Sequence, residues 1–257
     1  MVTARARPGT GQISATRFWI PASSRDFWVD RLAAAAVDFW GPEERFGESV
    51  VSLVDPDGLP LELVAREGGA PREPWAQGPV PVEHQIRGFA GATLCLNGYE
   101  HTAELLTATM GLRELAAEGS RFRFRVGDGQ DAATIDLHCR PETEPGRMGI
   151  GAAHHIAWRT TSREAQLEWR RVLAKAGMDL TPVLDRNYFE SIYFREPGGV
   201  LFEIATDSPG FTVDESPTEL GTHLTLPPWL EPRRQALAAR LPELRLPADL
   251  AVTKSLQ

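Results

Sequence analysis

The sequence has little cysteine and no long apolar run. Its two cysteines, Cys95 and Cys139, form no Cys-x-x-Cys pair, which excludes the common zinc-binding and redox motifs of cysteine. We expect both to be small buried residues in a reducing cytosol. No segment approaches the roughly 20 apolar residues that cross a bilayer, and the N-terminal residues lack the apolar stretch of a secretory signal. A cytoplasmic location is therefore expected.

Positively charged residues are outnumbered. The 257 residues include 27 Lys and Arg against 35 Asp and Glu, a formal net charge of -8. Nucleic acids and anionic membranes both require a basic face, so the composition argues against either as a partner. The hydrophobic share of 42% and the charged share of 24% are typical of a soluble globular protein. The length suits one large or two small domains.

The most informative feature is a pair of histidines followed by a distant glutamate. His154 and His155 begin an apolar, strand-like run, and Glu203 lies 48 residues after His155 in a second such run. Imidazole and carboxylate are ligand types that hold a redox-active divalent metal and leave coordination positions open. An unpaired carboxylate is costly to bury, and a metal would remove that cost. The pattern predicts two ligands of a metal site.

A turn motif occurs twice in the chain. Residues 53–64 match residues 194–205 at an offset of 141, and in both copies an acidic-Pro-x-Gly sequence joins two apolar segments. This sequence is typical of the turn of a β-hairpin. Upstream of each copy the pattern predicts a strand, a helix and further strands. A middle stretch follows a similar order but lacks the turn.

This order predicts an α+β fold of three tandem βαβββ units with a short C-terminal helical tail. The predicted units are residues 11–66, a degenerate unit at 87–141, and 150–206, which carries the metal residues. Residues 1–10 and 67–86 are predicted linkers, and residues 207–257 are the predicted tail. Within the third unit we expect a strand from His154 to Arg159 and a helix that Ser162 caps and Gly177 ends.

Several motifs of the third unit occur in a recognisable order. They are His154-His155-Ile156-Ala157, Asp185-Arg186-Asn187-Tyr188-Phe189, Ser191-Ile192-Tyr193-Phe194-Arg195-Glu196-Pro197-Gly198-Gly199, Leu201-Phe202-Glu203-Ile204-Ala205-Thr206-Asp207 and Pro209-Gly210-Phe211. With the three βαβββ units, they resemble the vicinal oxygen chelate superfamily, which includes glyoxalase I, bleomycin-resistance proteins and extradiol dioxygenases. Within it, the region resembles most closely the ring-cleaving dioxygenases that act on hydroquinones and related phenols. Weaker similarity extends from Arg7 onward.

The resemblance implies four βαβββ units in two half-barrel domains. In that family, a His-His strand of the first unit and the histidine and glutamate of the fourth hold the metal. Here the chain is expected to start near the end of that first unit, with residues 1–10 similar to its linker, so the first histidine is expected to be absent. The face that the first unit would cover is then open and apolar, which predicts self-association into a homo-oligomer.

The resemblance also implies a role for each site residue. His155 and Glu203 are the implied metal ligands, and His154 is a nearby acid or base. Consecutive strand residues point to opposite faces, which also argues against both histidines as ligands. Arg186 and Tyr193 resemble residues that line the substrate pocket, where a cation would stabilise a phenolate and a hydroxyl would orient substrate or oxygen.

These implications predict an extradiol-type, ring-cleaving dioxygenase that acts on a hydroquinone or a catechol-like phenol with O2 and Fe(II), or with Mn(II). One alternative is a glyoxalase-like lyase or isomerase that uses zinc or nickel and consumes no O2. Another is a non-catalytic protein that binds aromatic ligands, which the expected absence of the first metal histidine would favour.

The remaining candidate ligands are expected to be structural. Glu62 is the repeat counterpart of Glu203, but the positions that match the histidine pair fall at Ile13 and Ser14, which offer no imidazole. The other histidines have no ligand-like neighbours in the sequence: His84, His101, His138 and His223.

Overall fold

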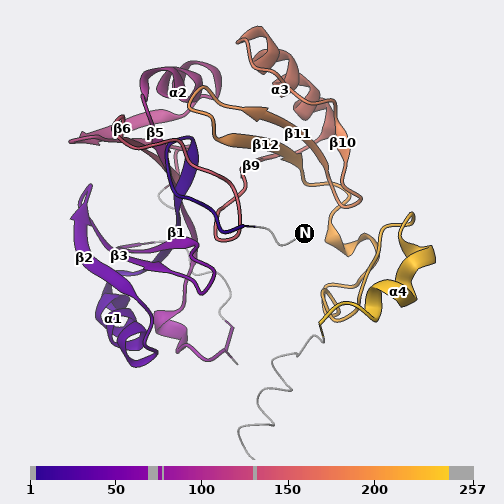
Figure 1. The fold of residues 1–257 in the computed structure, drawn as a ribbon, viewed down its shortest axis with the longest axis horizontal. Helices are drawn as coiled ribbons and strands as arrows, with labels where there is room; N and C mark the ends of the chain where they lie inside the picture. Colours follow the sequence, from indigo (N-terminus) through magenta and orange to yellow (C-terminus); the bar gives the residue numbers. More distant parts are fainter. Residues whose placement is uncertain (1–3, 69–74, 77, 130–131, 243–257) are drawn as a thin grey trace, which may run out of the picture.

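The strands of the protein form two sheets against which its longer helices pack (Figure 1). The computed structural model describes residues 4–68, 75–76, 78–129 and 132–242. Along this part of the chain the order strand, helix, three strands occurs three times. This architecture confirms the predicted α+β fold of βαβββ units with a short C-terminal helix.

The larger sheet joins the first two units. The first unit contributes β1 (Gln12–Pro21), β2 (Phe39–Arg45), β3 (Glu48–Val54) and β4 (Pro60–Arg66). The second contributes β5 (Gly88–Leu96), β6 (Arg113–Glu118), β7 (Arg121–Arg125) and β8 (Thr134–Cys139). The strand order is β2-β3-β4-β1-β5-β8-β7-β6. Strands β1 and β5 are antiparallel at the centre, whereas β1 with β4 and β5 with β8 are parallel. The sheet is therefore continuous across both units.

The smaller sheet belongs to the third unit. It consists of β9 (Ile156–Thr160), β10 (Leu184–Asp185), β11 (Glu190–Arg195) and β12 (Leu201–Thr206), in the order β10-β11-β12-β9. Strand β9 is parallel to β12, and no strand of the described residues pairs with its other edge. Such an edge offers backbone donors and acceptors to another strand. Self-association of the chain stays a prediction.

The repeated turn is built around its acidic residue in both copies. The Asp55 carboxylate accepts hydrogen bonds from the backbone N–H groups of Asp57 (2.9 Å) and Leu59 (2.8 Å). The Glu196 carboxylate accepts them from Gly198 (2.8 Å) and Val200 (2.7 Å). An acidic residue at the first turn position thus satisfies donors that the tight turn leaves free. This function explains why the turn is the clearest part of the repeat.

The helices differ in how they begin and end. Helix α3 (Arg163–Lys175) is capped as predicted, because Ser162 Oγ accepts a hydrogen bond from the Ala165 N–H at 3.2 Å, and Gly177 follows the helix with a φ of 85°. Helix α1 (Arg25–Ala34) follows a 3-10 turn, Ala22–Ser24, and Ser24 does not cap it. Its hydroxyl instead donates to the Glu83 carbonyl at 3.2 Å.

The remaining helical segments are short. Helix α2 (Glu100–Glu104) continues into a π-helical turn, Leu105–Thr109. Helix α4 (Arg234–Ala238) follows a 3-10 turn, Glu231–Arg233, in the C-terminal tail. Two further 3-10 turns are Val82–His84 and Phe211–Val213. No helix of the described residues is both long and apolar enough to cross a membrane.

One apolar core joins the two sheets. On the side of the larger sheet it includes Leu94 and Phe124, and on the side of the smaller sheet Phe202, with Leu106 and Leu173 from the helical segments between them. All five side chains are fully buried. A second cluster lies under α1 on the first unit. The helices therefore cover one face of each sheet. The opposite face, called here the inner face, carries polar groups and, on the larger sheet, a small apolar cluster of Trp19, Val50, Val64 and Ala90.

A backbone clasp connects the N-terminal segment to the chain that leads into the third unit. The Ala6 N–H donates to the Ile150 carbonyl (2.8 Å), the Arg7 N–H to the Arg147 carbonyl (2.9 Å), and the Gly146 N–H to the Thr10 carbonyl (2.9 Å). These residues pair as isolated bridges outside the named strands. The segments 4–10 and 144–150 thus lie side by side.

Some sequence predictions need correction or remain open. The strand expected from His154 begins at Ile156, because β12 starts at Leu201 and the ladder begins where Ile156 pairs with Phe202. The βαβββ prediction for the second unit did not locate strand β6, since all of its residues are exposed and carry no buried pattern. The unit boundaries stay predictions, and residues 1–3, 69–74, 77 and 243–257 of the predicted linkers and tail lie outside the described residues.

Replacing Leu173 by alanine should lower the free energy of unfolding by about 2–5 kcal/mol, because the side chain is fully buried between α3 and the smaller sheet. Leu167→Ala on the same helix is the matched control, since that side chain is 39% exposed and should cost less than about 1 kcal/mol. Urea unfolding followed by circular dichroism measures both values. Equal losses would contradict the assigned packing of α3.

Candidate metal centre

His155 and Glu203 meet on neighbouring parallel strands. Glu203 pairs with Ala157 in the β9–β12 ladder, and His155 lies two residues before Ala157, so alternation along the chain places both side chains on one face. His155 Nε2 lies 2.6 Å from Glu203 Oε2. His155 and Glu203 are 48 residues apart in the sequence but contact each other directly, because β9 and β12 are adjacent strands.

The Glu203 carboxylate is buried and each of its oxygens has a partner. The residue is 3% exposed, so an unpaired charge here would be costly. The hydroxyls of Ser191 and Tyr193, both on β11, donate to Oε1, Tyr193 at 2.8 Å. Oε1 is thereby held by hydroxyl donors while Oε2 faces His155. This division fixes the carboxylate and leaves one oxygen directed at the imidazole.

His154 lies on the far side of the His155 ring from Glu203. The Nδ1 atoms of the two histidines are 2.9 Å apart, and the rings are nearly perpendicular. His154 is exposed, whereas the His155 side chain is 31% exposed. A hydrogen bond at Nδ1 holds the ring so that Nε2 points to the carboxylate, as a neighbouring group commonly does for a metal-binding histidine.

Tyr193 and Arg186 complete the group of predicted residues. The half-buried Tyr193 ring lies edge-on to His155, with centroids 5.7 Å apart. The exposed Arg186 places its guanidinium carbon 5.4 Å from the centre of the Tyr193 ring, a distance typical of a cation–π contact. All five predicted site residues are thus neighbours in one chain of contacts. Arg186 makes no ion pair with a described carboxylate.

The chemistry of this donor pair fits a divalent metal. Imidazole nitrogen and carboxylate oxygen are the ligands that iron and manganese use in non-haem sites. A metal would take the place of the proton that joins Nε2 to Oε2, because a histidine ligand must give up that proton. No cluster of three or more His, Cys, Asp and Glu side chains with metal-binding geometry occurs in the described ranges. Among the described residues, His155 and Glu203 are therefore two candidate ligands, and no third is grouped with them.

An apolar cavity of about 430 Å³ runs along the open edge of β9 beside this pair. His155, Ala157 and Trp158 form one wall, and Phe89 and Ile135 of the larger sheet belong to the opposite wall. A cavity of this size falls within the range of roughly 300–1,000 Å³ that is usual for small-molecule sites. The walls suit a flat, largely apolar ring.

Glu62 has a structural environment, as expected from the sequence. Its carboxylate pairs with Arg45 Nη1 (2.8 Å) and Arg17 Nε (3.4 Å). The residue that matches His155 is Ala15, one position after the predicted match, because Arg17 lies 45 residues before its partner Glu62, whereas Ala157 lies 46 residues before Glu203. No imidazole occurs at either position.

Ser191 is a site residue that the sequence reasoning did not assign. Its hydroxyl donates to the same carboxylate oxygen as that of Tyr193. Ser191 lies two residues before Tyr193 on β11, so the alternation of a strand was the signal that could have placed it on the same face.

Comparison with known proteins gives a consistent family. The sequence profile of the Glyoxalase/Bleomycin resistance protein/Dioxygenase superfamily matches residues 89–204. MhqO of Bacillus subtilis, provisionally named a ring-cleaving dioxygenase, is 45% identical over 88% of this chain and 71% of its own length. The chlorohydroquinone/hydroquinone 1,2-dioxygenase of Sphingobium indicum is 34% identical over 87% of this chain and 70% of its own.

Solved structures agree with these relatives. A Bacillus subtilis protein, provisionally described as a dioxygenase, superposes with a TM-score of 0.87 at 42% identity, covering 95% of this chain and 77% of that protein. A glyoxalase I variant from Zea mays shares the fold, with a TM-score of 0.55 at 14% identity over 80% of this chain and 70% of that one. The predicted resemblance is confirmed: the chain belongs to the ring-cleaving dioxygenases of the glyoxalase, or vicinal oxygen chelate, superfamily.

Proposed function

We propose that this protein is a ring-cleaving dioxygenase that acts on a hydroquinone or a catechol-like phenol with O2, and that its metal is Fe(II), with Mn(II) as the alternative. Family membership implies a metal cofactor. The observation that carries the proposal is the contact of His155 Nε2 with the buried Glu203 carboxylate beside an apolar cavity. A relative that is 34% identical is named a chlorohydroquinone/hydroquinone 1,2-dioxygenase, which supports a dihydroxyaromatic substrate.

In this proposal His155 and Glu203 hold the metal. The metal, when bound, supplies a site where a phenol oxygen and O2 bind side by side and electrons pass between them. Ser191 and Tyr193 keep the Glu203 carboxylate in one orientation through hydrogen bonds to Oε1. Their donation leaves Oε2 as the coordinating oxygen. His154 keeps the His155 ring turned toward Glu203 through the contact at Nδ1.

The apolar cavity and Arg186 bind the substrate in this proposal. The apolar walls around Trp158 and Phe89 take the aromatic ring and exclude water, which strengthens electrostatic interactions within the site. Arg186, over the Tyr193 ring, supplies a positive charge that stabilises the phenolate formed when substrate loses a proton. His154 is exposed and can exchange that proton with solvent. Its role as the proton-transfer group is part of the proposal.

Metal retention tests the assignment of ligands. His155→Ala and Glu203→Gln should each reduce the iron that remains after reconstitution and dialysis by at least about tenfold, because each removes one of two contacting donors. His101→Ala, an exposed histidine on α2, is the control and should retain iron like the parent. Iron content is measured by atomic absorption. If both site variants kept iron at the level of the parent, the proposed ligands would be wrong.

Oxygen uptake tests the reaction and the role of the carboxylate's partners. Tyr193→Phe should lower kcat/KM for chlorohydroquinone by about 10–100-fold, because Glu203 Oε1 loses one hydroxyl donor while its apolar contacts remain. Tyr188→Phe is matched to it, since that hydroxyl bonds Asp214 at an exposed position. An oxygen electrode follows the reaction of the iron-loaded protein. Stoichiometric binding of the phenol by iron-loaded parent, without O2 uptake, would instead identify a non-catalytic binding protein.

A further inference from the structure

The inner face of the larger sheet carries a group of arginines that the proposed reaction does not use. Alternation along β1, β2, β4 and β7 brings them to the face opposite the helices. They are Arg17, Arg45, Arg66, Arg121 and Arg123. Arg17 is 1% exposed and Arg123 is 4% exposed. Guanidinium groups at this depth need anionic partners.

The buried carboxylates of this face are already shared among these arginines. Asp136 accepts from Arg123 Nε (2.7 Å) and Nη2 (2.8 Å), and lies 3.1 Å from Arg17. Glu48 bonds both Arg123 (2.6 Å) and Arg17 (3.0 Å). Glu62 is paired with Arg45 and Arg17, as described above. No carboxylate of this network is left to neutralise another cation.

Arg121 is the arginine that this network leaves without a partner. No carboxylate of the described residues lies within ion-pair distance of it, and its buried Nη1 atom has no hydrogen-bond partner among them. Burial lowers the pKa of the Arg121 guanidinium, and the nearby Arg45 lowers it further. Arg121 lies opposite His138 in the β7–β8 ladder, so the two side chains share the inner face. Glu62, Asp136 and Glu43 act in the opposite direction on this pKa, but none of them lies within ion-pair distance of Arg121.

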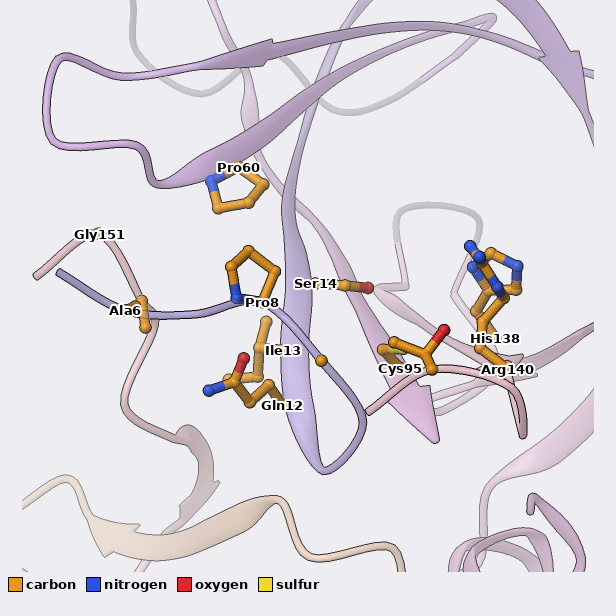
Figure 2. A pocket seen from close by; sticks show the side chains of 13 residues that line it. Ala6, Pro8, Gln12, Ile13, Ser14, Pro60, Cys95, His138, Arg140 and Gly151 are labelled. Atoms are coloured by element: carbon orange, nitrogen blue, oxygen red, sulfur yellow. The ribbon is translucent and has the colours of Figure 1, made fainter. Parts of the chain in front are cut away.

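The ring of His138 lines a cavity of about 230 Å³, called here the His138 cavity. Gln12, Ser14 and Arg140 also line it, and Pro8 and Pro60 close one side. Figure 2 shows the two prolines on one side, His138 and Arg140 on the other, and Ser14 between them. The cavity is smaller than the roughly 300–1,000 Å³ of sites for larger ligands, so only a small molecule fits.

We propose that the His138 cavity binds a small oxyanion of the carboxylate or phosphate class, held by His138, Arg140 and the Gln12 amide in the positive field of Arg121. Gln12 and Arg140 line the cavity and carry N–H donors; Gln12 Nε2 donates to Met148 Sδ at 3.7 Å, a weak contact that an anion would replace. Glu142 pairs with Arg140 at the exposed rim, where solvent screens its charge. The excess of guanidinium over carboxylate favours an anion here, although the whole protein is acidic.

Sulfate titration of the full chain tests the site. Calorimetry near pH 4 should show saturable binding to the parent, and Arg121→Gln and His138→Gln should each weaken it by about tenfold, since each removes a positive charge that favours the anion at this pH. Arg125→Gln, at the opposite end of β7, should bind like the parent. Arg121→Lys keeps the charge and should retain affinity, which separates the effect from misfolding. Competition by benzoate or by phosphate would assign the natural ligand to the carboxylates or to inorganic oxyanions.

The titration of His138 gives a second readout. Burial first, and then Arg121, Arg140 and Arg45, lower the pKa of His138 to about 4, against the opposing charge of Glu142. The thiol of Cys95, which also faces His138 from β5, has a pKa raised by burial and stays protonated. A bound anion raises the pKa of His138, so sulfate affinity should increase as the pH falls from neutral toward 4.

Because sulfate keeps its charge over this range, the pH dependence reports on the protein alone. The dependence should disappear in His138→Gln. In Arg121→Gln the pKa of His138, followed by NMR, should rise, because the variant lacks the cation that lowers this pKa most. No saturable sulfate binding to the parent, or equal affinity in the parent and both neutral variants, would overturn the proposal.

Discussion

The fold depends on the parallel pairing of the first and last strands within each unit. A helix and two strands separate these partners in the sequence, yet the ladder sets their side chains beside one another. In the third unit it places Glu203 opposite Ala157 and brings His155 onto the same face. In the first unit it places Glu62 opposite Arg17. A buried acidic residue thus faces the first strand in both units. The side chains of that strand determine which groups surround the carboxylate.

The two outcomes differ in how the buried carboxylate is neutralised. Arg17 and Arg45 pair with Glu62, and their guanidinium groups are permanently charged. They therefore occupy the position beside Glu62 that a metal would otherwise take. Glu203 meets a single imidazole and two hydroxyls, which exchange protons and leave room for a metal. The repeated unit therefore carries an ionic network in one sheet and the candidate metal site in the other.

The repeated units and the strands that carry the candidate site could be predicted because short sequence motifs indicate them. The acidic-Pro-x-Gly turn revealed the repeat, and the His-Glu spacing revealed the strands that meet. Two features escaped for physical reasons. The match to the histidines is displaced by one residue, because the first unit has one residue fewer than the third between its paired first and last strands, and the turn motif alone does not show where that residue is missing. The arginine network escaped because charged residues at alternate positions, such as Arg121 and Arg123, suggest a solvated face until the partner strands are known.

The clasp between residues 4–10 and 144–150 has a mechanical consequence. The chain leaves it through Gly151 and Ala152, which line the His138 cavity, and reaches His154 two residues later. A hinge between the two sheets at this point would have to break several backbone hydrogen bonds at once. The backbone hydrogen bonds of the clasp therefore restrict movement of the segment that leads to His154 and His155 relative to the larger sheet.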